Sequence, residues 1–186
     1  YLGVILDEAE HMNKLVRQLL TLSQLESEHP DLNLEVFDLR ESAESVLRKT
    51  QVLAEESGAK SSLLAPKEAL LVRADAFRID EVLMNYVSNA YHHVSEGGEV
   101  ILRLRVDGDR AHCEVFNSGK PIPEADLERV FEKFYKVDKA HTRKYGGSGI
   151  GLSIVRAIMT QHNMPCGVRN VENGVVFWFE LSLAAT

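Results

Sequence analysis

The stretch RIDEVLMNYVSNAYHH (78–93) joins a continuous apolar face to a polar face that carries two asparagines. Apolar side chains recur every three or four residues, which predicts an amphipathic helix from about Asp75 to Val94 packed on another layer. This apolar face consists of Ile79, Val82, Leu83, Tyr86, Val87, Ala90 and Val94. The polar residues stack on the other side of the helix, where they are Arg78, Glu81, Asn85, Asn89 and His92.

Two asparagines one helical turn apart can offer carbonyl oxygens to a hard cation and amide donors to phosphate oxygens. By themselves, Asn85 and Asn89 favour a solvated polar face over a binding site. Two further stretches favour the phosphate interpretation. In VFNSGKPIP (115–123), Asn117 leaves a strand where the chain turns through Gly119, and an asparagine can donate to and accept from adenine at once.

The second stretch, YGGSGIGLSI (145–154), places four glycines before an amphipathic helix that must end before Pro165. No strand precedes these glycines and no Gly-Lys-Ser/Thr follows them, which excludes a Rossmann fingerprint and a P-loop. Bare backbone at a helix start lets N–H groups approach an anion closely. A basic segment directly upstream could fold over the same anion; its cations are Lys133, Lys136, Lys139, Arg143 and Lys144.

The remaining pattern predicts an α+β fold with two layers, a mixed and mainly antiparallel sheet with helices on one face. We expect a helix over 39–57 ending near Gly58, and strands at 34–38, 60–65, 69–73, 100–106, 110–116 and 175–181. Asp107-Gly108-Asp109 and Asn173-Gly174 are turn signals between strands.

Residues 1–27 read as one helix whose apolar stripe has the spacing of a helical bundle; the stripe is Leu2, Ile5, Ala9, Met12, Val16 and Leu19. Such a helix needs a partner helix, from another chain or from sequence outside this one. Pro30 lies in a polar linker, so we expect two units, an incomplete bundle helix over 1–28 and an α/β domain over 29–186.

The amino-acid composition argues against two classes for this chain, general nucleic-acid binders and membrane-spanning segments. The chain is 45% hydrophobic and 26% charged, as in ordinary globular proteins, and its net charge of −7 argues against a general nucleic-acid binder. No apolar run is long enough to cross a membrane. Cys113 and Cys166 lack metal-ligand spacing, so we interpret them as reduced cysteines of a cytoplasmic protein.

Four ordered stretches, RIDEVLMNYVSNAYHH, VFNSGKPIP, FEKFYKVD and GGSGIGLSIV, resemble the N, G1, F and G2 boxes of sensor histidine kinases. The first 27 residues are similar to the second helix of the dimerisation bundle in those kinases. The resemblance implies the Bergerat ATP-binding fold, shared with Hsp90-, gyrase- and MutL-type ATPases, with ATP and Mg²⁺ as ligands.

The family's roles carry over where positions match. Asn89 stands where the family coordinates Mg²⁺, Asn85 where it contacts the metal–phosphate cluster, and 137–145 where it has a lid. The full set of implied nucleotide-binding residues is Asn85, Asn89, His92, Asn117, Gly119, Tyr135, Lys136, Arg143, Gly147, Gly149, Gly151 and Leu152.

Three positions depart from the family pattern. Asn117 replaces the usual adenine-reading Asp, which should weaken nucleotide binding by roughly 1 kcal/mol. Pro121 replaces a glycine and removes a backbone donor. His92 stands where a Lys or Arg usually faces phosphate, which predicts a contact sensitive to pH near 6.5.

None of the seven histidines has the context of a phosphoacceptor motif, so no catalytic residue is assigned and we expect no autophosphorylation by this chain alone. The resemblance implies transfer to a histidine of the dimerisation bundle, a homodimeric parent protein, and relay to a response-regulator aspartate. It also implies a cytoplasmic domain, anchored to the membrane only through upstream segments. Two alternatives stay open: a gyrase- or MutL-like ATPase that uses Glu81 to activate water, and an interaction module that binds ATP without turnover.

Overall fold

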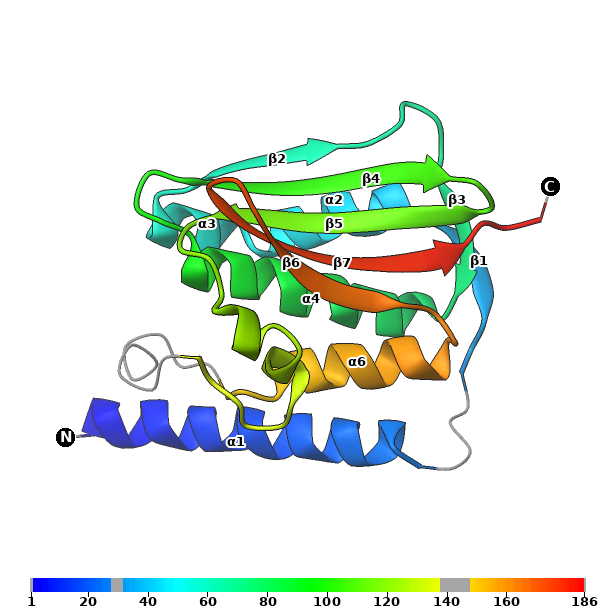
Figure 1. Cartoon of the computed structure of the whole chain (residues 1–186). Helices are drawn as coiled ribbons and strands as arrows, with labels where there is room; N and C mark the ends of the chain where they lie inside the picture. Colours follow the sequence, from blue (N-terminus) through cyan, green and yellow to red (C-terminus); the bar gives the residue numbers. More distant parts are fainter. Residues whose placement is uncertain (1, 28–31, 138–147, 186) are drawn as a thin grey trace.

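A computed structural model describes residues 2–27, 32–137 and 148–185 (Figure 1). Its main sheet has five strands in the order β2-β4-β5-β7-β6, and only the β2–β4 pair is parallel. The strands are β2 (Lys60–Leu64), β4 (Glu99–Asp107), β5 (Arg110–Ser118), β6 (Cys166–Val171) and β7 (Gly174–Ser182). The predicted mixed, mainly antiparallel sheet is therefore confirmed.

Two parts of the strand prediction were incomplete. β6 was missed because none of its residues is fully buried and its sequence shows no clean alternation of apolar and polar residues. β1 (Glu35–Asp38) and β3 (Leu71–Ala74) form a separate antiparallel pair. This pair is joined to the main sheet through a bridge between Val72 and Leu183, so the strands make two sheets instead of one.

The helices of the α/β unit cover one face of the main sheet, which confirms the two-layer prediction (Figure 1). They are α2 (Leu39–Lys49), α3 (Gln51–Ser57), α4 (Ala76–His93) and α6 (Gly151–Gln161), with two short 3₁₀ turns, η1 (Glu124–Asp126) and η2 (Arg129–Phe131). Asp38 and Asp75 cap α2 and α4 through bonds from the backbone N–H groups of Arg40 and Arg78.

The single helix predicted over 39–57 is interrupted at Thr50. Thr50 has φ −99° and ψ 11°, which lies outside helical geometry. Its hydroxyl donates to the carbonyl of Val46 at 2.9 Å, a local bond that competes with regular helix continuation. α3 then ends where predicted, at Gly58 in the left-handed conformation.

The apolar face of α4 forms the centre of the core. Six of its seven predicted positions are buried, Val94 is half-buried, and Tyr91 joins them. The hydroxyl of the fully buried Tyr86 donates to the carbonyl of Trp178 on β7. Its ring centroid lies 5.3 Å from that of Phe177. Each large apolar side chain buried here contributes about 1.5–3 kcal/mol to the stability of the fold. Burial of the apolar face of α4 therefore fixes the position of its polar face.

The outer face of the sheet carries a network of charged side chains centred on Glu114 of β5, which is only 4% exposed. Arg169 and Arg103 donate to its carboxylate at 2.7 and 3.0 Å, and His112 lies at 3.0 Å. Burial alone raises the pKa of Glu114, but these hydrogen bonds and charges lower the pKa to about 2. Both oxygens of this carboxylate are therefore engaged within the protein.

The N-terminal helix α1 (Leu2–Leu25) lies along α6, on the side away from the sheet (Figure 1). Leu22 and Leu25 are buried in the contact, Leu15 packs at its edge, and Lys133 forms an ion pair with Glu26 at 2.8 Å. The predicted bundle stripe points elsewhere, since Ile5, Met12, Val16 and Leu19 stay exposed. No helix in the described ranges has the length and apolar character needed to span a membrane.

Candidate functional site

The polar face of α4 meets the first turn of α6 at Asn85. The Asn85 side-chain amide donates to the carbonyl of Glu81 at 2.9 Å, so the amide nitrogen faces Glu81 and the side-chain oxygen is left for other contacts. A Cβ on Gly151 would lie 2.5 Å from this oxygen. Gly151 is therefore required for the close approach, and Asn85 Oδ1 lies at the start of a helix that has no side-chain cap.

A second contact joins the stretch before α6 to the segment after η2. The backbone N–H of Phe134 donates to the carbonyl of Gly149 at 2.8 Å, and both residues have positive φ, 62° and 71°. A Cβ on Gly149 would come within 3.0 Å of the Phe134 backbone. Glycine at 149 thus permits a specific contact between the stretches FEKFYKVD and GGSGIGLSIV, which the sequence analysis predicted to form one site.

Tyr135 and Lys136 follow this contact and are half-buried. The Tyr135 hydroxyl donates to Asp126 of η1, and the Arg129 guanidinium lies 4.3 Å from its ring centroid. The hydrogen bond to Asp126 raises the pKa of Tyr135. Tyr135 is accordingly held by the protein's own groups, and its position is set without a ligand.

Asn117 lies at the end of β5 and is only 3% exposed. Its side-chain amide makes one long bond, 3.4 Å to the carbonyl of Ser118. Gly119, with φ 154°, follows directly and bonds the Asn173 carbonyl at 3.0 Å. Asn117 therefore keeps most of its hydrogen-bonding capacity beside a glycine turn. A side chain that donates to and accepts from the polar edge of a ring needs this capacity.

The segment around Pro121 is fastened to β6 by Asn170. The Asn170 carbonyl oxygen accepts from the backbone N–H of Ile122 at 2.9 Å, and its amide donates to the Ile122 carbonyl at 2.7 Å. This two-way bond gives β6, the strand that sequence reasoning missed, a direct role in shaping the exit of β5.

His92 is the last predicted residue of the α4 polar face and is half-buried. Burial lowers the pKa of His92 from its ordinary value, and the nearby charges of His93 and of Lys14 on α1 lower it further. Asn89, one turn earlier on the same face, is half-buried as well, whereas Leu152 turns its side chain into the core.

The predicted residues Arg143 and Gly147, and nearly all of the predicted lid over 137–145, lie outside the described residues. In the described part of the chain no group of three or more His, Cys, Asp or Glu side chains could hold a metal ion. The side chains of Asn85 and Asn89 offer amide oxygens, the type of ligand that suits a hard cation.

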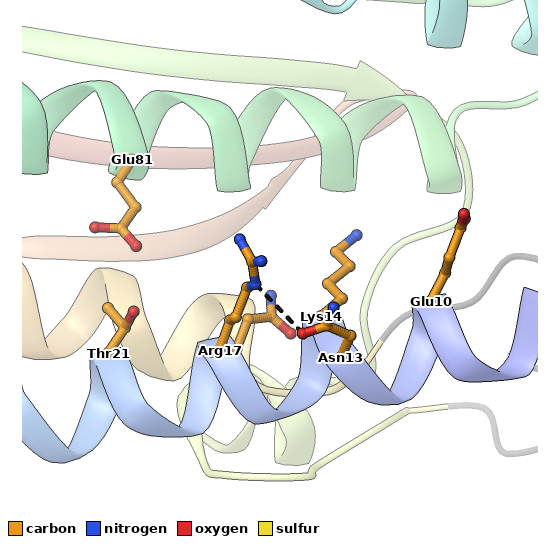
Figure 2. Close-up of a pocket in the computed structure, with 7 residues that line it drawn as sticks. Glu10, Asn13, Lys14, Arg17, Thr21 and Glu81 are labelled. Atoms are coloured by element: carbon orange, nitrogen blue, oxygen red, sulfur yellow. Dashed lines mark hydrogen bonds between the residues drawn. The ribbon is translucent and has the colours of Figure 1, made fainter.

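A pocket of about 370 Å³ lies between α1 and α4 (Figure 2). Its lining residues are Glu10, Asn13, Lys14, Arg17, Gln18, Thr21 and Glu81. Glu81 on the α4 side pairs with Arg78 at 3.0 Å, while Lys14 and Arg17 extend from α1 toward α4. Sequence reasoning placed none of the α1 residues at the site, because nothing in a helical stripe indicates which domain it will face.

Residues 74–185 match the family model described as histidine kinase-, DNA gyrase B-, and HSP90-like ATPase. The chain is similar to the sensor histidine kinase WalK of Bacillus subtilis (strain 168), 32% identical over 184 residues that cover 97% of this chain and 30% of WalK. The chain spans well under half the length of the curated relatives it matches.

Solved structures of kinases have the same fold. Full-length ShkA in complex with AMPPNP is 26% identical and superposes with a TM-score of 0.86, over 100% of this chain and 39% of ShkA. The histidine kinase ThkA in complex with the response regulator protein TrrA is 29% identical, with a TM-score of 0.80 over 99% of this chain and 51% of that one. In both, the likeness includes α1 as well as the α/β unit.

Proposed function

Because the chain belongs to the family of histidine kinase-, DNA gyrase B- and HSP90-like ATPases, as the ATP-binding domain of a sensor histidine kinase, we propose that it binds Mg-ATP and phosphorylates a histidine. The observation that carries this proposal is the meeting of Asn85 with Gly151. There an amide oxygen faces an uncapped helix start, so phosphate oxygens and a cation can be held side by side.

The donor set fits magnesium. Asn85 donates one amide hydrogen to the carbonyl of Glu81 and keeps its oxygen for other partners, and Asn89 lies one turn further along α4. In our proposal Asn89 is the protein ligand and Asn85 orients the phosphate–metal cluster. Bound there, Mg²⁺ would neutralise charge on the β- and γ-phosphates.

The protein's part in the transfer is positioning. Asn117 and Gly119 would hold the adenine at the end of β5, and the glycines at 147, 149 and 151 would hold the phosphates. Tyr135 and Lys136 would border the phosphates, and Arg143 of the predicted lid would close over them. An acceptor imidazole nitrogen then attacks γ-phosphorus as the bond to the ADP oxygen breaks, with Asn85 and His92 near the charge that develops.

The acceptor and the downstream partner are parts of the same proposal. The exposed stripe of α1, with Ile5, Met12 and Val16, suits pairing with helices of a dimeric acceptor bundle. The phosphoryl group would pass from the bundle histidine to an aspartate of a response regulator. The complex of the similar kinase ThkA with a response regulator supports this assignment, which would place the domain in the cytoplasm.

An ATPase that uses Glu81 as a base is less favoured, because Arg78 already pairs with its carboxylate at 3.0 Å within α4. One experiment separates the alternatives: incubation with γ-labelled ATP and Mg²⁺, with and without a separate acceptor bundle. Label on the bundle histidine supports the kinase, and free phosphate from the chain alone supports the ATPase. Intact bound ATP in both arms supports a module without turnover and contradicts our proposal.

A further inference from the structure

The pocket between α1 and α4 (Figure 2) includes Glu81, which lies one turn before Asn85 of the proposed phosphate site on the same helix. Along α4, the distance from Glu81 to Asn89 is about 12 Å at 1.5 Å per residue. Along α1, the lining residues from Glu10 to Thr21 span about 16.5 Å by the same rise. The α1 segment is therefore long enough to run past the part of the polar face that would hold the phosphates.

The α1 wall of the pocket carries two cations that the fold does not use for packing. Lys14 and Arg17 are exposed, whereas the contact of α1 with α6 is made by Leu15, Leu22 and Leu25. Arg17 donates its Nε to Asn13 Oδ1 at 3.3 Å, a neutral partner on its own helix. Among the described residues, no carboxylate oxygen lies within the 4 Å of an ion pair from either cation.

Both cations point at α4, as Figure 2 shows, and Lys14 is close enough to His92 to influence its charge state. The opposite wall offers Glu81, whose carboxylate is already paired with Arg78. Glu10 also lines the pocket, but its carboxylate lies outside ion-pair distance of both cations. With Glu81 paired to Arg78, the pocket keeps an excess of one positive charge next to a site suited to phosphates. An anion that extends from that site toward α1 would be stabilised by both side chains.

We propose that Lys14 and Arg17 of α1 bind the terminal phosphate of the nucleotide held by α4, so that this helix distinguishes a nucleoside triphosphate from a diphosphate. The inference rests on the proposed nucleotide site and adds two specificity-determining residues from outside the α/β unit. The β-phosphate stays with Asn85 and the start of α6, and only the γ-phosphate reaches the α1 cations.

The test is calorimetric titration of the chain with ATP and with ADP, each with Mg²⁺, for the double variant Lys14→Gln/Arg17→Gln. We expect the affinity for ATP to fall about tenfold and that for ADP to change less than twofold, since partly exposed phosphate contacts each contribute a few-fold. The variant Arg48→Gln/Lys49→Gln removes the same charge from the exposed end of α2 and should leave both affinities unchanged.

The charge-conserving swap Lys14→Arg/Arg17→Lys should retain the preference for ATP, and thermal unfolding of all variants should match that of the original chain. Equal losses for ATP and ADP, or no loss for either, would overturn the assignment of Lys14 and Arg17 while leaving the nucleotide site intact. If the original chain binds neither nucleotide, the proposed function itself fails. This outcome differs from a failure of the Lys14 and Arg17 assignment, in which the original chain still binds ATP.

Discussion

Two clusters of charged and polar side chains lie on opposite sides of the α/β unit, and they differ in how completely they satisfy themselves. On the outer face of the sheet, Glu114 is buried and bonded to Arg169, Arg103 and His112. On the helical side, Lys14 and Arg17 border a pocket beside the α4 polar face. The first cluster is closed and the second is open.

The difference indicates their roles. A buried carboxylate with all its partners supplied by the protein stabilises the fold and has no capacity left for a ligand. Cations that face a pocket and an amide oxygen that faces a helix start have capacity to bind one. The outer cluster has the higher density of charged side chains, but its hydrogen bonds are already made within the protein. The groups on the helical side still have free donors and acceptors, so the functional site is expected there.

The largest effect should come from breaking the closed cluster. Glu114→Ala removes two charge-assisted hydrogen bonds and leaves Nε2 of the buried His112 without its partner, so we expect a loss of about 3 kcal/mol in the free energy of unfolding. Denaturant titration measures it, with Glu99→Ala on exposed β4 sequence as the control. Affinity for ATP should not change; a stable variant that lost nucleotide binding would contradict the division into two roles.

The same cluster predicts acid sensitivity. The folded-state pKa of Glu114, about 2, lies below the ordinary value of 4.5. Its contribution to stability is therefore fully present above pH 4.5 and lost as the pH falls toward 2. Denaturant titrations across this window should show a decline that the Glu114→Gln variant lacks; parallel curves for the two proteins would count against it.

Next in size is a change in the open cluster. Asn89→Ala removes the proposed magnesium ligand, and we expect about a hundredfold weaker binding of ATP in Mg²⁺, close to 2.7 kcal/mol. Because Asn89 is only half-buried, the unfolding temperature should hardly move. Calorimetry with and without Mg²⁺ checks this, and unchanged affinity in Mg²⁺ would remove Asn89 from the site.

A smaller effect is expected at the end of β5. Asn117→Asp restores a charge-assisted hydrogen bond to the adenine amino group, which should tighten ATP binding about fivefold. The preference for ATP over GTP should increase with it. Competition titrations of the two nucleotides measure both quantities, and identical values in the variant would show that Asn117 does not contact the base.

The smallest effect concerns His92. Because burial and neighbouring cations lower its pKa, it becomes protonated only below its ordinary value of 6.5. Bound phosphates favour the charged form, so ATP affinity should rise about two- to threefold as the pH falls from 7 toward 5.5. His92→Gln corrects for the titration of ATP itself; a matching pH profile in that variant would exclude His92.

Sequence patterns predicted helices and strands correctly where the apolar residues recur with a single period and form one buried face. α4 was predicted to within a residue at each end because its apolar face is unbroken and Asp75 caps it. β4, β5 and β7 alternate cleanly and were found. β6 contains Gly167, Arg169 and Asn170 and does not alternate, so only its pairing with β7 identifies it.

The proximity of some motif residues was predictable to a similar degree, whereas their binding of a nucleotide stays a prediction. The motifs placed Asn85, Gly149 and Gly151 in one nucleotide site, and the structure brings Asn85 to Gly151 and Gly149 to Phe134. The pairing of Glu81 with Arg78 and the place of Lys14 beside His92 were outside the reach of motif reasoning, because both depend on side-chain contacts between or within helices.

The sequence by itself determined the two-layer architecture, the family and the identity of the motif residues, since periodicity and local turn chemistry are written residue by residue. The tertiary structure alone decided which face of α1 meets the α/β unit. The helix carries one stripe with Leu15, Leu22 and Leu25 and another with Ile5, Met12 and Val16, and either could have been buried. Burial of the first on α6 turns Lys14 and Arg17 toward α4, and a helical period cannot encode that choice.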